Sequence, residues 1–283
     1  MSISQPATQP AGPGIPIATA PPDAGPRRGF DQRYLAPMLI TLILVAGNWT
    51  TGMLESPWKT GLAIASAIGT EALLSRLTRG TWPHMASAYI TGISVGILVR
   101  SPFFWPYALC AIISILSKYV LQAGGRHVWN PSNFGIVMML IFAHPTVATL
   151  SIQWDNRLLL MVPIWMVGLM VLYRLRRLHI SATYAASFIG LSAVRSFQTG
   201  HAFLAEVAPI TGPMYQLFTL FMVTDPPTTV RGMRPQILVV FLVALMEHVL
   251  RLNHVIHAPY YALFTVGPAA LLTQRWWSAR RSA

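Results

Sequence analysis

Ten apolar segments, separated by short loops, follow one another through most of this chain. Each segment is long enough to form a helix, and together they leave little polar sequence for a water-exposed surface. Charged residues make up 10% of the 283 positions, against about 25% in a typical soluble domain. We therefore predict an all-α polytopic membrane protein. The approximate spans are 35–53, 60–76, 85–99, 103–121, 133–150, 158–173, 180–194, 211–223, 235–250 and 258–273.

The distribution of basic residues predicts how these spans are oriented. If the N-terminus is cytoplasmic, fifteen of the 20 Lys and Arg residues fall on the inner side of the membrane. Cytoplasmic loops of membrane proteins carry this excess, so both termini are expected to be cytoplasmic. Because the basic residues are scattered between apolar runs, the net charge of +12 does not indicate a nucleic-acid partner. The five outer residues are Lys59, Arg100, Arg157, Arg195 and Arg251.

Ten spans divide into two sets of five, and a repeat with an odd number of spans inverts its orientation in the membrane. The third and eighth predicted spans, at corresponding positions of the two halves, open with YITGISVGILVRSP (89–102) and PITGPMYQLFTLFMVTDP (209–226). Both stretches carry Ile-Thr-Gly near the start and a polar residue before a final Pro. The predicted fold is therefore two inverted five-helix repeats. Several spans are shorter than the ~20 residues of a straight crossing, which suggests broken or re-entrant helices.

The ends of the chain differ from this central part in composition. Residues 1–34 are rich in Pro and Ala and lack the apolar stretch of a signal peptide, which predicts a disordered cytoplasmic tail. The predicted membrane domain covers 35–275, and a short basic cytoplasmic tail covers 276–283. The single cysteine, Cys110, lies in an apolar run, so neither a disulfide nor an iron–sulfur site is expected within the chain. We predict that it is a packing residue.

The segment GGRHVWNPSNFG (124–135) carries more special chemistry than a connecting loop needs. Pro131 disfavours a helical conformation at Asn130, so Asn130 or Ser132 can cap the helix that follows. The free N–H groups of a helix start attract anions or carbonyl oxygens, and the amides of Asn130 and Asn133 both donate and accept hydrogen bonds. Two interpretations remain open: a capped helix start without a ligand, or a binding site.

A second unusual segment is FMVTDPPTTVRGMRP (221–235). Asp225 is one of eight acidic residues in the chain and stands at the end of an apolar span. Thr224 is expected to hydrogen-bond locally, and Arg231 and Arg234 are the nearest basic partners in sequence. One interpretation is an Asp–Arg pair that fixes a cytoplasmic loop. The other is a second wall of the pocket that the first segment faces.

Ionisable residues inside predicted spans are functional candidates by default. Glu71 is expected to pair with Arg76 one turn later, and Lys118 to extend its ammonium group to the membrane interface. Glu247 and Arg251 are four residues apart, which predicts a structural ion pair near the outer end of the ninth span.

Three stretches resemble membrane proteins of ion-pumping flavin redox complexes, namely the D subunit of the Rnf complex and the B subunit of the Na⁺-translocating NADH:quinone reductase. The Phe-Asn-Pro-Ala motif of that family appears here as Trp-Asn-Pro-Ser at 129–132. The resemblance covers about 85–275 and is typical of a shortened, divergent member, similar to those associated with enediyne-type natural-product clusters. The three stretches are AYITGISVGILVRSPFFWPYALCAIISILSKYVLQAGGRHVWNPSNFGIVMMLI (88–141), VGLMVLYRLRRLHI (167–180) and LFMVTDPPTTVRG (220–232).

The resemblance implies a multi-pass protein of the bacterial inner (plasma) membrane, with redox partner subunits and a bound flavin. The family carries FMN esterified to a threonine in a Ser/Thr-Gly-Ala-Thr motif, and the quinone reductase also carries a non-covalent riboflavin. That motif is absent here, because Thr146 and Thr149 of the loop 144–157 lack the Gly-Ala context. Any flavin, riboflavin or FMN, is therefore expected to be non-covalent. The implied binding residues are Asn130, Pro131, Ser132, Asn133, Thr224 and Asp225.

Two functions follow from these observations. The first is a flavin-binding membrane electron-transfer protein, coupled to ion movement or supplying electrons to a biosynthetic pathway, and at most a redox component of a larger oxidoreductase without catalytic residues of its own. The second is a transporter or channel that keeps the inverted-repeat fold without the redox role. Its site is expected at the breaks of the third and eighth spans, near Thr91 and Thr211.

Overall fold

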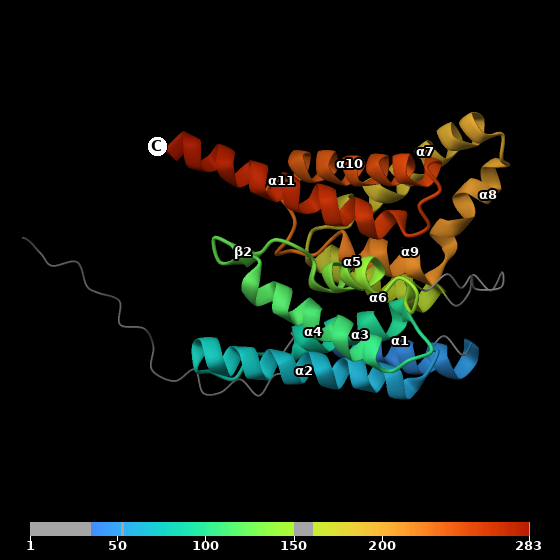
Figure 1. Ribbon diagram of the computed structural model, residues 1–283. Helices are drawn as coiled ribbons and strands as arrows, with labels where there is room; N and C mark the ends of the chain where they lie inside the picture. The colour runs from blue at the N-terminus through green and yellow to red at the C-terminus, as the bar shows by residue number, and fades with distance from the viewer. Residues whose placement is uncertain (1–34, 52–53, 150–160, 283) are drawn as a thin grey trace, which may run out of the picture. The chain divides into compact units, whose positions relative to one another are not determined.

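The computed structural model describes residues 35–51, 54–149 and 161–282, so the predicted N-terminal tail lies outside the described residues. The described part is mostly helical (Figure 1), which confirms the predicted all-α class at this level. Its eleven α-helices are α1 (Leu35–Thr51), α2 (Pro57–Arg79), α3 (Ala86–Leu98), α4 (Trp105–Val120), α5 (Pro131–Phe142), α6 (Met161–Arg174), α7 (Leu178–Thr199), α8 (Phe203–Val207), α9 (Pro213–Leu217), α10 (Met233–Leu252) and α11 (Ala258–Ser282).

Nine of the ten predicted spans coincide with one helix each, apart from shifts at their ends. Local signals fix the ends of α2 and α7: each stops at a glycine in the left-handed region, Gly80 with φ 67° and Gly200 with φ 75°. Helix α5 stops at Phe142, earlier than predicted, and α11 continues to Ser282 through most of the predicted basic tail. The eighth span, 211–223, is the exception, because it is broken into short helices.

Helix length does not by itself confirm ten membrane crossings. Among the described helices, α10 alone is both long and apolar enough to cross a membrane, with 20 residues. Four other apolar helices, α3, α4, α5 and α6, have between 10 and 17 residues. The multi-pass arrangement therefore stays a prediction.

The two halves of the described chain pack their helices in the same order (Figure 1). In the first half, α2 packs against α4, and α4 packs against α5. In the second half, α7 packs against α10, and α10 packs against α11. Helix α5 also contacts α11, and α1 contacts α6, so both halves contribute to one hydrophobic core.

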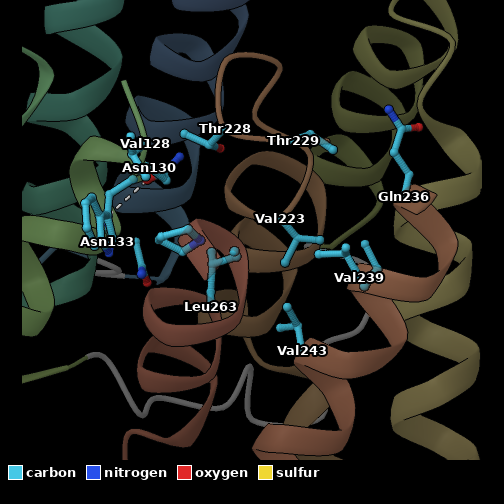
Figure 2. A pocket seen from close by; sticks show the side chains of 14 residues that line it. Val128, Asn130, Asn133, Val223, Thr228, Thr229, Gln236, Val239, Val243 and Leu263 are labelled. Carbon is cyan, nitrogen blue, oxygen red and sulfur yellow. Dashed lines mark hydrogen bonds between the residues drawn. The ribbon is translucent and has the colours of Figure 1, made fainter. Parts of the chain in front are cut away.

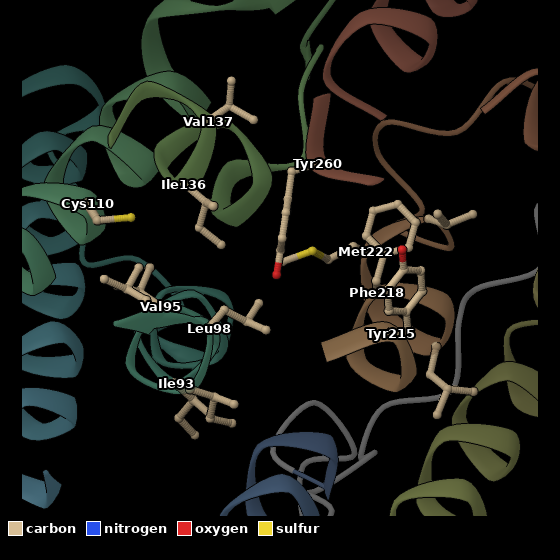
Figure 3. Packing of buried hydrophobic residues seen from close by; sticks show 14 of the residues in the cluster. Ile93, Val95, Leu98, Cys110, Ile136, Val137, Tyr215, Phe218, Met222 and Tyr260 are labelled. Carbon is tan, nitrogen blue, oxygen red and sulfur yellow. The ribbon is translucent and has the colours of Figure 1, made fainter. Parts of the chain in front are cut away.

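The core is built from apolar side chains of both halves, and Tyr260 of α11 lies between them (Figure 3). Ile93 and Ile136 come from the first half, and Phe218 comes from the second, with its ring 6.2 Å from that of Tyr260 and nearly perpendicular to it. Each such buried side chain stabilises the fold through many close van der Waals contacts. Cys110 is fully buried here, as the sequence predicts for a packing residue.

Helix α3 lies against α2 through two glycines that leave no room for side chains. A Cβ atom built on Gly92 would lie 2.5 Å from the Cα of Ile64, and one on Gly96 would lie 2.6 Å from the Cγ2 of Thr60. Small residues four apart let two helices approach closely, as they do between membrane helices. The α2–α3 contact therefore depends on these two glycines.

Candidate functional site

A tight hairpin explains the two glycines of the segment 124–135. Strands β2 (Gln122–Ala123) and β3 (Arg126–His127) pair antiparallel, with Gln122 opposite His127. Gly124 and Gly125 form the two-residue turn with φ of 51° and 73°, the left-handed values that such turns require. The turn places Arg126 and His127 at the start of the site.

Arg126 and His127 bring the two unusual segments of the sequence together. The Arg126 guanidinium donates hydrogen bonds to the carbonyl oxygens of Pro226 (2.8 Å) and Thr229 (3.1 Å). The Nε2 atom of His127 lies 3.5 Å from the Oδ2 atom of Asp225. The segments 124–135 and 221–235 therefore meet, as one of the two interpretations of the segment 221–235 required.

Asn130 caps α5 as predicted. Its backbone is extended (φ −60°, ψ 124°), Pro131 takes the first helical position, and the Asn130 side chain accepts a hydrogen bond from the Asn133 backbone N–H at 3.0 Å. Ser132 is buried in the first turn and is not the cap.

Asn133 carries a buried acceptor without a partner. The residue is only 1% exposed, and its Nδ2 donates to the Tyr260 carbonyl oxygen at 3.2 Å. Its Oδ1 has no hydrogen-bond partner in the described part of the chain. An unpaired buried acceptor is costly, so this oxygen indicates a place for a water molecule or a ligand group.

The partner of Asp225 differs from the sequence prediction. In place of Arg231 or Arg234, the described chain brings the imidazole of His127 and the hydroxyl of Thr228 to its carboxylate, and Thr228 donates to Oδ2 at 3.1 Å. The reason is that β3, far away in sequence, packs beside the loop. Thr224 bonds locally as predicted, its hydroxyl donating to the Leu220 carbonyl oxygen at 2.7 Å.

The cavity where the two segments meet is small (Figure 2). Asn130 and Asn133 line one side, and Gln236 of α10 lies on the other, with Thr228 and Thr229 also in the lining. The cavity has a volume of about 30 Å³, which suits a single water molecule. The lining therefore includes two of the six predicted binding residues, the two asparagines, and does not include the other four: Pro131, Ser132, Thr224 and Asp225.

A flavin fits the chemistry of this cavity but not its size. The free Asn133 oxygen could accept from a flavin N–H, yet sites for ligands of that size have volumes of roughly 300–1,000 Å³. The two threonines considered for covalent attachment are both engaged. Thr146 donates to the Ala143 carbonyl oxygen, and Thr149 bonds to His257 at 2.8 Å, where β4 (Ala148–Thr149) pairs with β1 (Val99–Arg100). The rest of that loop, 150–157, lies outside the described residues.

A second polar site, centred on Arg195 of α7, was missed as a group at the sequence level. Arg195 is 3% exposed, and its Nε donates to the Oε2 of Glu206 in α8, while its Nη2 donates to the hydroxyl of Ser192 at 3.0 Å. Glu206 also contacts His201 at 3.0 Å and Arg251 at 3.9 Å. The sequence did carry a signal for this pair, because Glu206, one of only eight acidic residues, follows Arg195 just beyond the turn at Gly200.

Glu247 of α10 extends this cluster into the core. Its two carboxylate oxygens accept hydrogen bonds from the hydroxyls of Tyr184 (2.5 Å) and Tyr215 (2.6 Å), and the residue is 1% exposed. Arg251 lies 3.8 Å from Glu247, which confirms the predicted pair at this spacing. We call Arg195, Glu206, Glu247, Arg251, Tyr184, Tyr215 and His201 the buried charge cluster.

The ionisable residues of the first half pair differently from the sequence prediction. Glu71 bonds to the ammonium group of Lys118 at 2.5 Å and to the hydroxyl of Tyr119 at 2.9 Å. Arg76 instead donates to the Gly80 carbonyl oxygen at the end of α2. Helix α4 packs on α2 and brings Lys118 against Glu71, while the prediction that Lys118 reaches the membrane interface stays a prediction.

The eighth predicted span is discontinuous beside the buried charge cluster. It begins at the end of a 3₁₀-helix (Ala208–Thr211) that follows α8, and it contains α9 and a π-helix at Phe218–Met222, with Gly212 extended before α9. Thr211 lies in this interrupted region, as predicted. Thr91 lies inside the continuous helix α3, so the predicted break in the third span is wrong.

Comparison of the sequence with known proteins gives no family to which these two sites could be assigned. A scan against protein-family models finds no match for this sequence, and a search of curated proteins finds no match either. The resemblance to flavin-carrying membrane proteins therefore rests on the quoted motifs alone.

Proposed function

We propose that this chain is a multi-pass protein of a bacterial inner membrane, with both termini cytoplasmic. Large apolar side chains at the surface support the proposal: Trp49 is 89% exposed and Phe197 is 93% exposed, and many others lie on the outer faces of the helices. Soluble monomers rarely expose apolar surface on this scale. The helices too short to cross the membrane straight pack against longer ones, as re-entrant or broken segments must.

The proposed architecture is two inverted five-helix repeats. The matched packing order of α2, α4 and α5 with α7, α10 and α11 supports it, as does the division of the chain into two sets of five predicted spans. In this arrangement α3 corresponds to the discontinuous segment from α8 to the π-helix, and a repeat of five spans inverts its direction in the membrane.

The function that the geometry supports best is proton-coupled transport of a small solute or ion. The discontinuous helix beside the buried charge cluster carries this proposal, because interrupted helices and their exposed backbone ends form the substrate and ion sites of many transporters. Ionisable groups held inside a membrane protein mark ion and proton paths. Here the exposed imidazole of His201 contacts Glu206, which joins the outer surface to the cluster.

The residues of the cluster have distinct roles in this proposal. His201 lies at the exposed side of the cluster, and Glu206 links it to the fixed positive charges of Arg195 and Arg251. Glu247, the most deeply buried carboxylate of the cluster, is the group whose charge changes during the transport cycle. The hydroxyls of two tyrosines, Tyr184 and Tyr215, hold its carboxylate in place.

The test is proton movement in vesicles that contain the purified chain and an internal pH indicator. Glu247→Gln keeps the shape of the side chain and an acceptor for a tyrosine hydroxyl but cannot take up a proton. We expect it to lower the coupled proton flux at least tenfold without loss of folded protein. The matched control is Glu55→Gln, which makes the same change at a glutamate outside the cluster. Glu55 accepts hydrogen bonds from Lys59 and from the hydroxyl of Tyr107. Wild-type flux equal to that of empty vesicles, or unchanged flux in Glu247→Gln, would refute the proposal.

A second function, flavin-dependent electron transfer, is favoured by one observation, the unpaired Asn133 oxygen between the two family-like segments. It requires the cavity to open well beyond its volume of about 30 Å³. The visible spectrum of the detergent-purified protein separates the two functions. The transport proposal expects a colourless protein. A bound flavin that is released completely by acid, and is therefore non-covalent, would favour electron transfer over transport.

If flavin is present, the asparagines give a second readout. Asn130→Ala combined with Asn133→Ala should weaken its binding about 5- to 150-fold, because each lost hydrogen bond is worth roughly 0.5–1.5 kcal/mol. The matched control is Ser132→Ala, which removes a buried hydroxyl of the same helical turn outside the cavity lining. Equal loss of flavin in Ser132→Ala would point to a general disturbance of α5.

A further inference from the structure

A large groove runs between α10 and α11, and it is distinct from the small cavity and from the buried charge cluster. Its volume is about 1530 Å³, and the two helices lie side by side in Figure 1. Along α10 the groove reaches from Pro235 to Val249, which is about 21 Å at the helical rise of 1.5 Å per residue. Its walls are mainly apolar and include Leu238, Leu242 and Met246 of α10 and Val266 and Ala270 of α11.

One end of the groove is strongly basic. Its lining includes Arg126, Arg231, Arg275 and Arg281, and no carboxylate belongs to the described lining. Burial, and then the guanidinium groups of Arg231 and Arg275, lower the pKa of Arg126, against the opposing effect of Asp225. The arginines are therefore close enough to repel one another, and an anion between them would relieve that repulsion.

The arginines are held at this end by three different parts of the chain. Arg126 comes from the hairpin and is fixed by the carbonyl oxygens of the loop 226–229. The backbone of Arg231 exchanges two hydrogen bonds with the side chain of Gln274 in α11, at 2.7 and 2.8 Å. Arg275 contacts the carbonyl oxygen of Gly124 at 3.4 Å, and a Cβ at Gly124 would lie 2.5 Å from its Nη1. This convergence is a feature of the fold rather than of one flexible side chain.

We propose that the groove binds an anionic phospholipid, with its phosphate among Arg126, Arg231 and Arg275 and its acyl chains along α10 and α11. Arginine suits phosphate because its planar guanidinium offers paired N–H donors. A free phosphate would use the basic end but would leave the apolar walls uncovered, whereas a lipid covers both. The hydrocarbon core of one leaflet is ~15 Å thick, half that of the bilayer, and the groove is longer than this. The groove can therefore hold an acyl chain of a lipid in the cytoplasmic leaflet. Trp277 in the lining suits the interface depth.

The proposal rests on the proposed membrane location but not on proton-coupled transport. The experiment uses detergent-purified full chain and measures the binding of fluorescent phosphatidylglycerol, with fluorescent phosphatidylcholine as the probe whose headgroup has no net charge. We expect phosphatidylglycerol to bind about tenfold or more tightly than phosphatidylcholine. Arg231→Gln combined with Arg275→Gln should abolish that preference. The matched control, Arg174→Gln with Arg176→Gln, removes two exposed arginines that do not line the groove and should preserve it.

A second variant tests the apolar part while leaving every charge in place. Ala270→Trp fills the groove between the helices and should weaken phosphatidylglycerol binding about tenfold, with circular dichroism and elution volume unchanged. Equal binding of the two lipids, or an unchanged preference in the double arginine variant, would overturn the proposal. Displacement of the lipid by excess inorganic phosphate would assign the basic end to a free anion instead.

The outcome is distinguishable from a failure of the proposed function. Glu247→Gln should bind phosphatidylglycerol like the wild type, because Glu247 does not line the groove. Absent proton flux with intact lipid selectivity would therefore reject transport alone. Recovery of the chain in the aqueous fraction, without membranes or detergent, would reject the membrane location and the lipid site together.

Discussion

Arg195→Ala is expected to lower the free energy of unfolding by about 3 kcal/mol. Removing one partner of a buried ion pair costs ~3–5 kcal/mol, because the other charge stays buried without compensation. The lower end applies here, since Arg251 remains 3.9 Å from Glu206 and His201 keeps its own contact. The measurement is thermal unfolding of the detergent-purified chain, followed by tryptophan fluorescence. The transition should move to lower temperature by several degrees.

Two further variants separate the ion pair from other causes. Arg174→Ala removes an exposed arginine at the end of α6 and should leave the transition unchanged. Arg195→Met combined with Glu206→Leu removes both charges and should restore most of the lost stability, because apolar replacements of a buried pair are often neutral or stabilising. If the double variant is no more stable than Arg195→Ala, then the loss comes from the hydrogen bonds of Arg195 to Ser192 and to the Glu206 backbone, which both variants lack, rather than from the charge pair.

The positions of the helices could be predicted because their signals are local. Pro57 at the first turn of α2 and Gly80 just beyond its end both act within a few residues. The break in the eighth span was harder to place, since the stretch 203–222 is largely apolar and only Gly212 and the prolines beside it mark an interruption. A break was also expected in the third span, but α3 contains no proline and is one continuous helix.

The sites depended on contacts between residues far apart in sequence, and this limited their prediction. That the segments around Asn130 and Asp225 meet was one of two interpretations that the sequence left open. The identity of the partner did not follow, because the choice of His127 over Arg231 is made by a hairpin packing on a loop about 100 residues later. The size of a cavity depends on every side chain around it, and the sequence pattern carries no measure of that volume.

Gly92→Leu is expected to prevent most protein molecules from reaching the native packing of their helices. At Gly92 even a Cβ atom would lie 2.5 Å from the backbone of α2, so a larger side chain must push the two helices apart. Overpacking a core usually costs about 1–3 kcal/mol, and displacement of a whole helix places this variant at or above the upper limit. We expect a large loss of protein that elutes as a single species, and a lower unfolding temperature for the remainder.

Gly69→Leu is the matched control, because it introduces the same side chain on α2 at a position where a Cβ would meet nothing within 4 Å. A glycine inside a helix costs about 0.8–1 kcal/mol relative to a good helix former, so this variant should be as stable as the wild type or slightly more stable. The two substitutions thus have opposite expected signs although they are chemically identical. Equal yields and unfolding temperatures for both would show that α3 does not lie against α2 at Gly92. The place of α3 in the proposed inverted repeat would then have to be revised.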